Sequence, residues 1–117
     1  MILVRFYNIR IDNGREFFDS ETFKVLISGH AGDNVKGRDI VCSAVSALSQ
    51  TLVLSIERLI KAKQTVKIEN GFMSATVETG SIEQKEKLKL LIESFLIGIL
   101  EIQKEHPGRI RLDFEVC

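Results

Sequence analysis

The sequence has few of the residues that mark several common classes of protein. It contains two cysteines in 117 residues, Cys42 and Cys117, so it cannot build the disulfide framework of a small secreted domain. A single proline excludes a proline-rich linker. Sixteen Lys and Arg residues are balanced by sixteen Asp and Glu residues, and this lack of a positive excess argues against direct nucleic-acid binding.

Signals for export, membrane insertion and metal binding are also missing. Residues 1–5 have neither the basic segment nor the cleavage site of a secretory signal. Glu57 and Arg58 interrupt the longest apolar run, which therefore falls short of the roughly 20 residues of a membrane helix. The CxxC and HxxxH spacings of metal sites are absent, and no cofactor is expected. These absences predict a soluble protein of a reducing cytoplasm, without membrane contact.

The chain has enough apolar residues to bury a core. Hydrophobic residues make up 44% of the sequence, and the length predicts one domain over 1–117. Residues 2–12 have the composition of a strand, and Asn13-Gly14 supplies a turn after it. The alternation of apolar residues in 2–12 is imperfect, which indicates either a bulge or burial on both faces. A second strand, 22–28, alternates more cleanly, with Phe23, Val25 and Ile27 on one face.

Two helices are predicted from apolar residues spaced three and four apart. The first begins with Asp39 as its N-cap. A second apolar stripe on a neighbouring face predicts that this helix is buried on more than one side. The second helix opens with the S-x-x-Q capping box 81–84 and ends at His106-Pro107-Gly108. The main stripe of the first helix is Val41, Val45, Leu48, Leu52, Ile56 and Leu59, and its second stripe is Ile40, Ala44, Ala47 and Leu54.

Three more strands complete the predicted fold. Strands 65–69 and 72–78 are joined by Asn70-Gly71, a pair typical of the type I′ turn. In the last strand, 110–116, alternate apolar residues face inward. The order β-β-α-β-β-α-β predicts an α+β fold of two layers, with two helices on one face of a roughly five-stranded, mostly antiparallel sheet. The extra apolar surface of the first helix predicts a homodimer.

The candidate chemistry lies between Gly29 and Ser46. Cys42 falls in the first turn of a helix, where the positive end of the helix dipole favours the thiolate. His30 ends the preceding strand, and a loop that folds back would bring its imidazole to the sulfur. The imidazole would then take the thiol proton, and the thiolate would attack a carbonyl carbon. The alternative is that Cys42 is a small buried residue of the core.

The literal residues favour the first interpretation. The segment 29–32, Gly-His-Ala-Gly, is followed at 37–46 by Gly-Arg-Asp-Ile-Val-Cys-Ser-Ala-Val-Ser. This pattern closely resembles the signature of the ribosomal-processing cysteine protease family, called Prp. The resemblance implies a cytoplasmic bacterial endopeptidase that works as a homodimer. It implies a ribosomal protein precursor as the substrate: the enzyme removes a short N-terminal extension from the twenty-seventh protein of the large subunit, cutting after an aromatic pair.

The same resemblance implies roles for individual residues. It makes His30 the general base and Cys42 the nucleophile, and Gly29, Asp39 and Ser46 match further positions of the family pattern. Glycine at position 29 allows a tight turn at the end of the strand. Ser46 follows Cys42 by four residues and therefore shares its helical face. Asp39 either caps the helix or orients the His30 ring.

The loop 31–38, which contains Gly32 and Gly37, has little to bury, so we expect it to be mobile and to close over a bound peptide. A competing hypothesis for the whole chain is a non-enzymatic dimeric module that binds a ribosomal or RNA partner. In that hypothesis Cys42 is a structural residue of the core.

Overall fold

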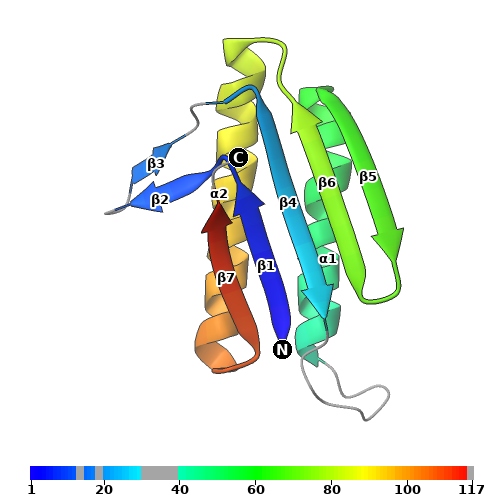
Figure 1. Cartoon of the computed structure of the whole chain (residues 1–117), viewed down its shortest axis with the longest axis vertical. Helices are drawn as coiled ribbons and strands as arrows, with labels where there is room; N and C mark the ends of the chain where they lie inside the picture. The colour runs from blue at the N-terminus through cyan, green and yellow to red at the C-terminus, as the bar shows by residue number, and fades with distance from the viewer. Residues whose placement is uncertain (13–14, 18–19, 30–39, 116–117) are drawn as a thin grey trace.

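Two helices cover one face of a five-stranded sheet in this computed structural model, which describes residues 1–12, 15–17, 20–29 and 40–115 (Figure 1). The strand order is β5-β6-β4-β1-β7, with β1 and β7 parallel and the other three pairs antiparallel. The predicted α+β fold of two layers is therefore confirmed. The elements of this fold are β1 (Ile2–Tyr7), β4 (Thr22–Gly29), α1 (Ile40–Ser55), the π-helical segment η1 (Ile56–Ile60), β5 (Lys63–Glu69), β6 (Phe72–Glu78), α2 (Ile82–Glu105) and β7 (Ile110–Glu115); a separate antiparallel pair consists of β2 (Arg10–Asp12) and β3 (Arg15–Phe17).

The first predicted strand, 2–12, is interrupted at Asn8. This residue takes a left-handed backbone conformation with a φ of 65°, and the chain then leaves the main sheet to form β2. The break shifts the alternation by one residue, so Phe6 before it and Ile9 after it are both fully buried. The predicted bulge or two-face burial is therefore wrong, and the predicted turn at Asn13-Gly14 lies outside the described residues.

The core fills the space between the sheet and the helices. The aromatic ring of Phe6 lies at its centre, stacked on Phe114 of β7 with 5.3 Å between ring centroids. Phe95 of α2 meets the same ring edge-on at 6.0 Å. Because aromatic rings bury large areas and pack directionally, this cluster holds β1, β7 and α2 together. The sheet contributes further core residues from alternate positions: Ile2, Val4, Phe23, Val25, Ala75, Val77 and Ile110.

The last strand, β7, packs its predicted apolar residues toward this core. Ile110 is buried, Leu112 packs against the core cluster, and Phe114 stacks on the first strand as described. Val116, the last residue of the predicted alternation, lies outside the described part of the chain. The inward-facing pattern of this strand is thus confirmed for the residues that the structure describes.

The hairpin of β5 and β6 forms as predicted, but its turn has a different type. Gly71 has a φ of 72°, whereas Asn70 does not take a positive φ. A type I′ turn requires positive φ at both central residues, so that prediction is wrong. Positive φ at the second position alone is the pattern of a type II turn, which also favours glycine there.

The main apolar stripe of α1 faces the sheet until the helix changes its pitch. Its described members are buried or half-buried up to Ile56, but Leu59 is 65% exposed and Ile60 is buried in its place. The cause is η1, in which the backbone N–H of Lys61 donates to the carbonyl of Ile56, five residues back. A π turn contains one more residue than an α turn, so the inward-facing position moves by one residue. The predicted N-cap, Asp39, lies outside the described residues.

The second apolar stripe of α1 is not buried within one chain. Ile40 is 67% exposed, Leu54 is 43% exposed, and Ala47 is also exposed, because these residues lie on the flank turned away from the sheet. The segment Ile40–Ile60 is long and apolar enough to span a membrane by length and composition, contrary to the expectation from the sequence. A core helix of a soluble protein meets the same criterion, and the buried flank of this helix packs on the sheet.

The predicted boundaries of α2 are confirmed. The side chain of Ser81 accepts a hydrogen bond from the Gln84 backbone N–H at 3.1 Å, and the Gln84 side chain accepts one from the Gly80 backbone N–H at 2.7 Å. These two bonds form a capping box with one difference. The Gln84 side chain accepts from the N–H of Gly80, the residue before the N-cap, instead of from the N–H of the N-cap Ser81 itself. At the other end, the His106 backbone N–H donates to the carbonyl of Ile102 and closes the last turn.

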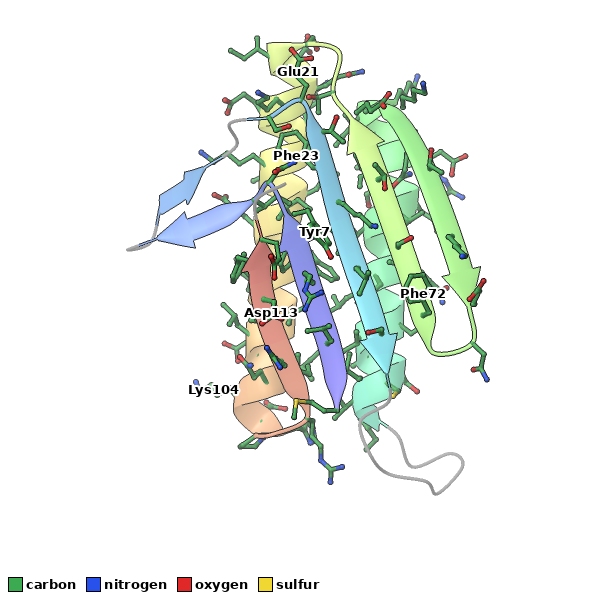
Figure 2. The ribbon with its side chains drawn as sticks, viewed as in Figure 1. Tyr7, Glu21, Phe23, Phe72, Lys104 and Asp113 are labelled. Atoms are coloured by element: carbon green, nitrogen blue, oxygen red, sulfur yellow. The ribbon has the colours of Figure 1, made fainter. Side chains whose placement is uncertain are left out.

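An ion pair on the open face of the sheet joins the first and last strands. Arg5 donates from Nη2 to Oδ2 of Asp113 at 3.0 Å, and Arg111 donates from Nε to Oδ1 at 3.2 Å. Asp113 is labelled on β7 in Figure 2. The hydrogen bond from Arg5, reinforced by the one from Arg111, lowers the pKa of the Asp113 carboxyl below its usual value. Arg5 and Asp113 are also direct partners in the β1–β7 register, so the pair stabilises the parallel contact.

We predict that Asp113→Asn lowers the free energy of unfolding at pH 7 and has little effect at pH 2. A carboxyl whose pKa is lowered by folding stabilises the native state above its unfolded pKa of about 3.9, and this contribution is lost as the pH falls through the folded pKa. Urea denaturation of both proteins between pH 7 and pH 2 measures the difference. The control is Glu83→Gln, which removes an exposed pair with Lys87. A wild-type advantage over Asp113→Asn that stays constant across this range would contradict the prediction.

Candidate active site

A pocket of about 220 Å³ opens between the first half of α1 and the β5–β6 hairpin. Three predicted site residues line it: Gly29 at the end of β4, and Cys42 and Ser46 on α1. Figure 1 shows how this is possible, since β4 ends beside the first turn of α1. The remaining walls are mainly apolar and include Ile2, Ile27, Val45, Ile68, Phe72 and Met73.

Cys42 is the third residue of α1 and is half-buried. The buried neighbours Val41 and Val45 lie to one side of it on the helix, and its own side chain packs at the margin of the core, where it also lines the pocket beside the hairpin. The first turn of a helix has unpaired backbone N–H groups and the positive end of the dipole, both of which favour a negatively charged sulfur. A thiol placed in this way, at the wall of an apolar pocket, is suited to nucleophilic attack.

Ser46 lies one turn further along the same flank of α1, as the sequence predicts. It is exposed, and its Oγ accepts a hydrogen bond from Nε2 of Gln50 at 2.9 Å. Ser49, which also lines the pocket, is buried and donates its hydroxyl to the Val45 carbonyl at 2.6 Å. The exposed Ser46 hydroxyl is therefore the polar group of this pair that faces a ligand.

Gly29 is required by two features of its backbone. Its φ of 93° lies in a region that favours glycine, and a Cβ atom here would lie 2.5 Å from the carbonyl oxygen of Met1. Its N–H donates to the carbonyl of Gly71 at 2.9 Å, which ties the end of β4 to the hairpin turn. The positive φ agrees with the expectation that this position needs glycine, whereas the tight turn itself would involve residues outside the described part of the chain and stays a prediction.

Four predicted site residues, His30, Gly32, Gly37 and Asp39, lie outside the described residues. The Cys-His pair, the two roles considered for Asp39 and the closure of the loop therefore stay predictions. The structure does describe what flanks this segment: Gly29 immediately precedes it, and α1 follows it. Gly29 and Cys42, the third residue of α1, line one pocket, so the elements on both sides of this segment contribute to the same site.

Reasoning from the sequence missed the hairpin side of the pocket. Ile68, Glu69, Phe72 and Met73 line it from β5 and β6, and Phe72 is labelled in Figure 2. Asn70-Gly71 identified the hairpin, but the order of strands in the sheet, which brings the hairpin beside α1, has no local signal. Within the described ranges, no cluster of three His, Cys, Asp or Glu side chains could hold a metal ion.

Comparison with known proteins shows consistent similarities. Residues 8–111 match the model of the family described as cysteine protease Prp. A Staphylococcus aureus protein named ribosomal processing cysteine protease Prp is 28% identical over 94 residues, covering 78% of this chain and 85% of that protein.

Two solved structures are similar in fold. The S. aureus Prp structure with a covalently linked product peptide has a TM-score of 0.73 at 22% identity, covering 97% of this chain and 99% of that one. A Streptococcus mutans protein has a TM-score of 0.69 at 29% identity, covering 100% and 96% of the two chains.

We predict that Gly29→Ala destabilises the fold by roughly 2–4 kcal/mol, because it adds a steric clash with Met1 to an unfavourable φ. Gly108→Ala is the matched control: its φ is 79°, but no atom lies within 4 Å of the added Cβ, so it should cost only about 1–2 kcal/mol. Urea denaturation of the two variants checks the difference. Equal costs would show that the approach of the Met1 carbonyl is not a constraint.

Proposed function

The chain belongs to the Prp family of cysteine proteases, and from that premise we propose that it removes a short N-terminal extension from a ribosomal protein precursor, the twenty-seventh protein of the large subunit. The observation that carries this proposal is the position of Cys42, in the first turn of a helix and at the wall of an apolar pocket. Its partial exposure there argues against the alternative in which Cys42 is only a core residue of a binding module.

The proposed mechanism uses Cys42 as the nucleophile and His30 as the general base. The imidazole takes the thiol proton, and the thiolate attacks the scissile carbonyl carbon to form a tetrahedral intermediate. The C–N bond then breaks, the imidazolium gives its proton to the leaving amine, and a thioester remains on the sulfur. Water, deprotonated by the same imidazole, hydrolyses the thioester and restores the thiol.

The pocket favours an apolar side chain next to the scissile bond. Ile27, Val45 and Met73 offer no charge to a ligand, whereas an aromatic ring would bury its surface among them. This supports cleavage after an aromatic pair. The S. aureus relatives, one named ribosomal processing cysteine protease Prp and one solved with a covalently linked product peptide, support a ribosomal protein as the substrate.

Supporting roles follow from the same proposal. Ser46 offers a hydroxyl to the substrate from the flank that holds Cys42. Asp39 caps α1 or orients the His30 ring, and the loop with Gly32 and Gly37 closes over the peptide.

A substrate that joins the ribosome supports a cytoplasmic location for the enzyme. The balance of sixteen basic and sixteen acidic residues supports recognition of the protein precursor rather than of RNA.

We also propose that the working form is a homodimer. Large apolar side chains are exposed on the outer faces of both helices, including Leu54 on α1 and Leu90 and Ile97 on α2, the last two being 67% and 65% exposed. Leu90 and Ile97 are seven residues apart and so lie on one face of α2. An apolar surface of this kind on a helical layer is suited to pack against its copy.

Replacing Cys42 with Ser should reduce kcat/KM for a peptide spanning the processing junction by roughly 10³-fold or more, because a hydroxyl is a far weaker nucleophile than a thiolate. Mass spectrometry of the cleavage products measures the loss. Cys117→Ser is the matched control and should cleave at the wild-type rate. Turnover by a folded Cys42→Ser protein would contradict the proposed nucleophile.

The base is tested with His30→Ala, which should cost roughly 10²–10⁴-fold in kcat. It should also slow the alkylation of Cys42 by iodoacetamide, because the imidazole promotes thiolate formation. A variant that keeps both the wild-type kcat and the wild-type alkylation rate would remove His30 from the mechanism.

Sedimentation equilibrium at micromolar concentration should give a mass of about 26 kDa, twice the 13.2 kDa of one chain. Ile97→Lys should shift the mass toward 13.2 kDa without unfolding the protein, because it places a charge on the proposed contact. A wild-type protein that sediments only as a monomer at these concentrations would contradict the dimer.

A further inference from the structure

The strand β5 forms one edge of the main sheet, and its outer edge has no partner among the strands that the structure describes. Its register with β6 decides which backbone groups face outward. Glu69 and Phe72 close a two-residue turn and therefore exchange both of their backbone hydrogen bonds, and hydrogen-bonded pairs alternate along an antiparallel ladder. The N–H and C=O groups of Gln64, Val66 and Ile68 thus point away from the sheet.

The side chains of these same residues face the helix layer. Ile68 and Val66 pair with the core residues Met73 and Ala75, yet they are 63% and 37% exposed. They are exposed because α1 covers the neighbouring strands and only borders β5. An edge strand with exposed apolar side chains at alternate positions is a surface on which another strand could add.

The pocket at the nucleophile lies between α1 and the end of β5. Cys42 and Ser46 line it from the helix, and Ile68 and Glu69 line it from the strand. Nε2 of Gln64 on β5 donates to the Val53 carbonyl of α1 at 3.2 Å and joins the two elements about three helical turns from Cys42. From Cys42 to Val53 the helix rises about 16 Å, which matches about five residues of an extended chain.

We propose that the substrate segment preceding the scissile bond adds to the outer edge of β5 as an extra strand. This inference rests on the proposed function, which places apolar and aromatic residues in that segment. The peptide pairs with the outward backbone groups of β5, and every second side chain covers Val66 and Ile68. Continuity with the catalytic pocket supports this occupant, because Ile68 lines the same pocket as Cys42.

Backbone methylation of the peptide tests the pairing directly. In a series of junction peptides, each with one N-methylated amide before the scissile bond, methylation at every second position should weaken binding to the Cys42→Ala protein about three- to tenfold. The positions between them should have little effect, because their amides point away from β5. Isothermal titration calorimetry measures the binding, so the result does not depend on catalysis.

A pair of variants on β5 provides the matched test from the side of the protein. Ile68→Lys, on the helix-facing side of β5, should weaken peptide binding about tenfold and raise KM, because it removes the apolar contact. Thr65→Lys adds the same charge to the opposite face of the same strand and should change neither. Alkylation of Cys42 by iodoacetamide should be unaffected in Thr65→Lys.

The outcomes separate this inference from the proposed function. Cleavage by the wild type with no alternation among the methylated peptides, or with equal effects of the two lysines, would overturn strand addition and leave the protease intact. Alternating binding without cleavage would retain strand addition and overturn the protease. A peptide that is neither bound nor cleaved would overturn both. If Ile68→Lys converts a dimer to a monomer, β5 is a subunit contact and the inference is wrong.

Discussion

The rotation of α1 about its own axis is the constraint on which the site depends. The rotation of the helix is fixed by the burial of three residues in the core, Val41, Val45 and Leu52. Successive residues of an α-helix are about 100° apart, so this orientation turns Cys42 toward the β5–β6 hairpin. A rotation by one residue would direct the thiol into the core or toward α2. Hydrophobic packing of the neighbouring residues thus sets the direction of Cys42, which itself packs at the margin of the core.

The rest of the pocket comes from the sheet, and a separate set of contacts holds it in place. The register of β4 with β6 sets Ile27 opposite Met73, and the bond from the Gly29 N–H to the Gly71 carbonyl fixes the end of β4 beside the hairpin turn. The helix therefore supplies the thiol and the dipole, while the sheet supplies the apolar surface. This division lets substrate preference change in the strands without moving the nucleophile.

The sequence was informative where a signal is local. The capping box at Ser81 fixed the start of α2, and the three-and-four spacing identified the stripe of α1 that faces the sheet. The residue motif around Cys42 was equally local, and it identified the family. The break at Asn8 was not predicted: the Asn8 side chain donates a hydrogen bond to the carbonyl of Thr22, fourteen residues away, and no local pattern in the sequence indicates that contact.

Two further features could not be predicted because the spacing of apolar residues does not indicate them. The phase of α1 past Ser55 depends on the π-helical segment η1, which leaves Leu59 exposed although the spacing favours its burial. The contribution of Ile68 to the pocket depends on the position of β5 in the sheet, since only this order brings the strand beside α1. Periodicity identifies the face that a helix or strand buries, but it does not identify the neighbour against which that face packs.

The π turn at Ile56–Ile60 has a consequence for how this chain tolerates changes of length. A π turn is an α turn with one residue inserted, so deleting a residue there would leave a continuous α-helix and need not disturb what precedes it. A deletion between Cys42 and Val45 would instead rotate the thiol by about 100° relative to the residues that face the sheet. Insertions and deletions among relatives should therefore occur mainly in the segment after Ser55, where the π turn already contains one residue more than an α turn.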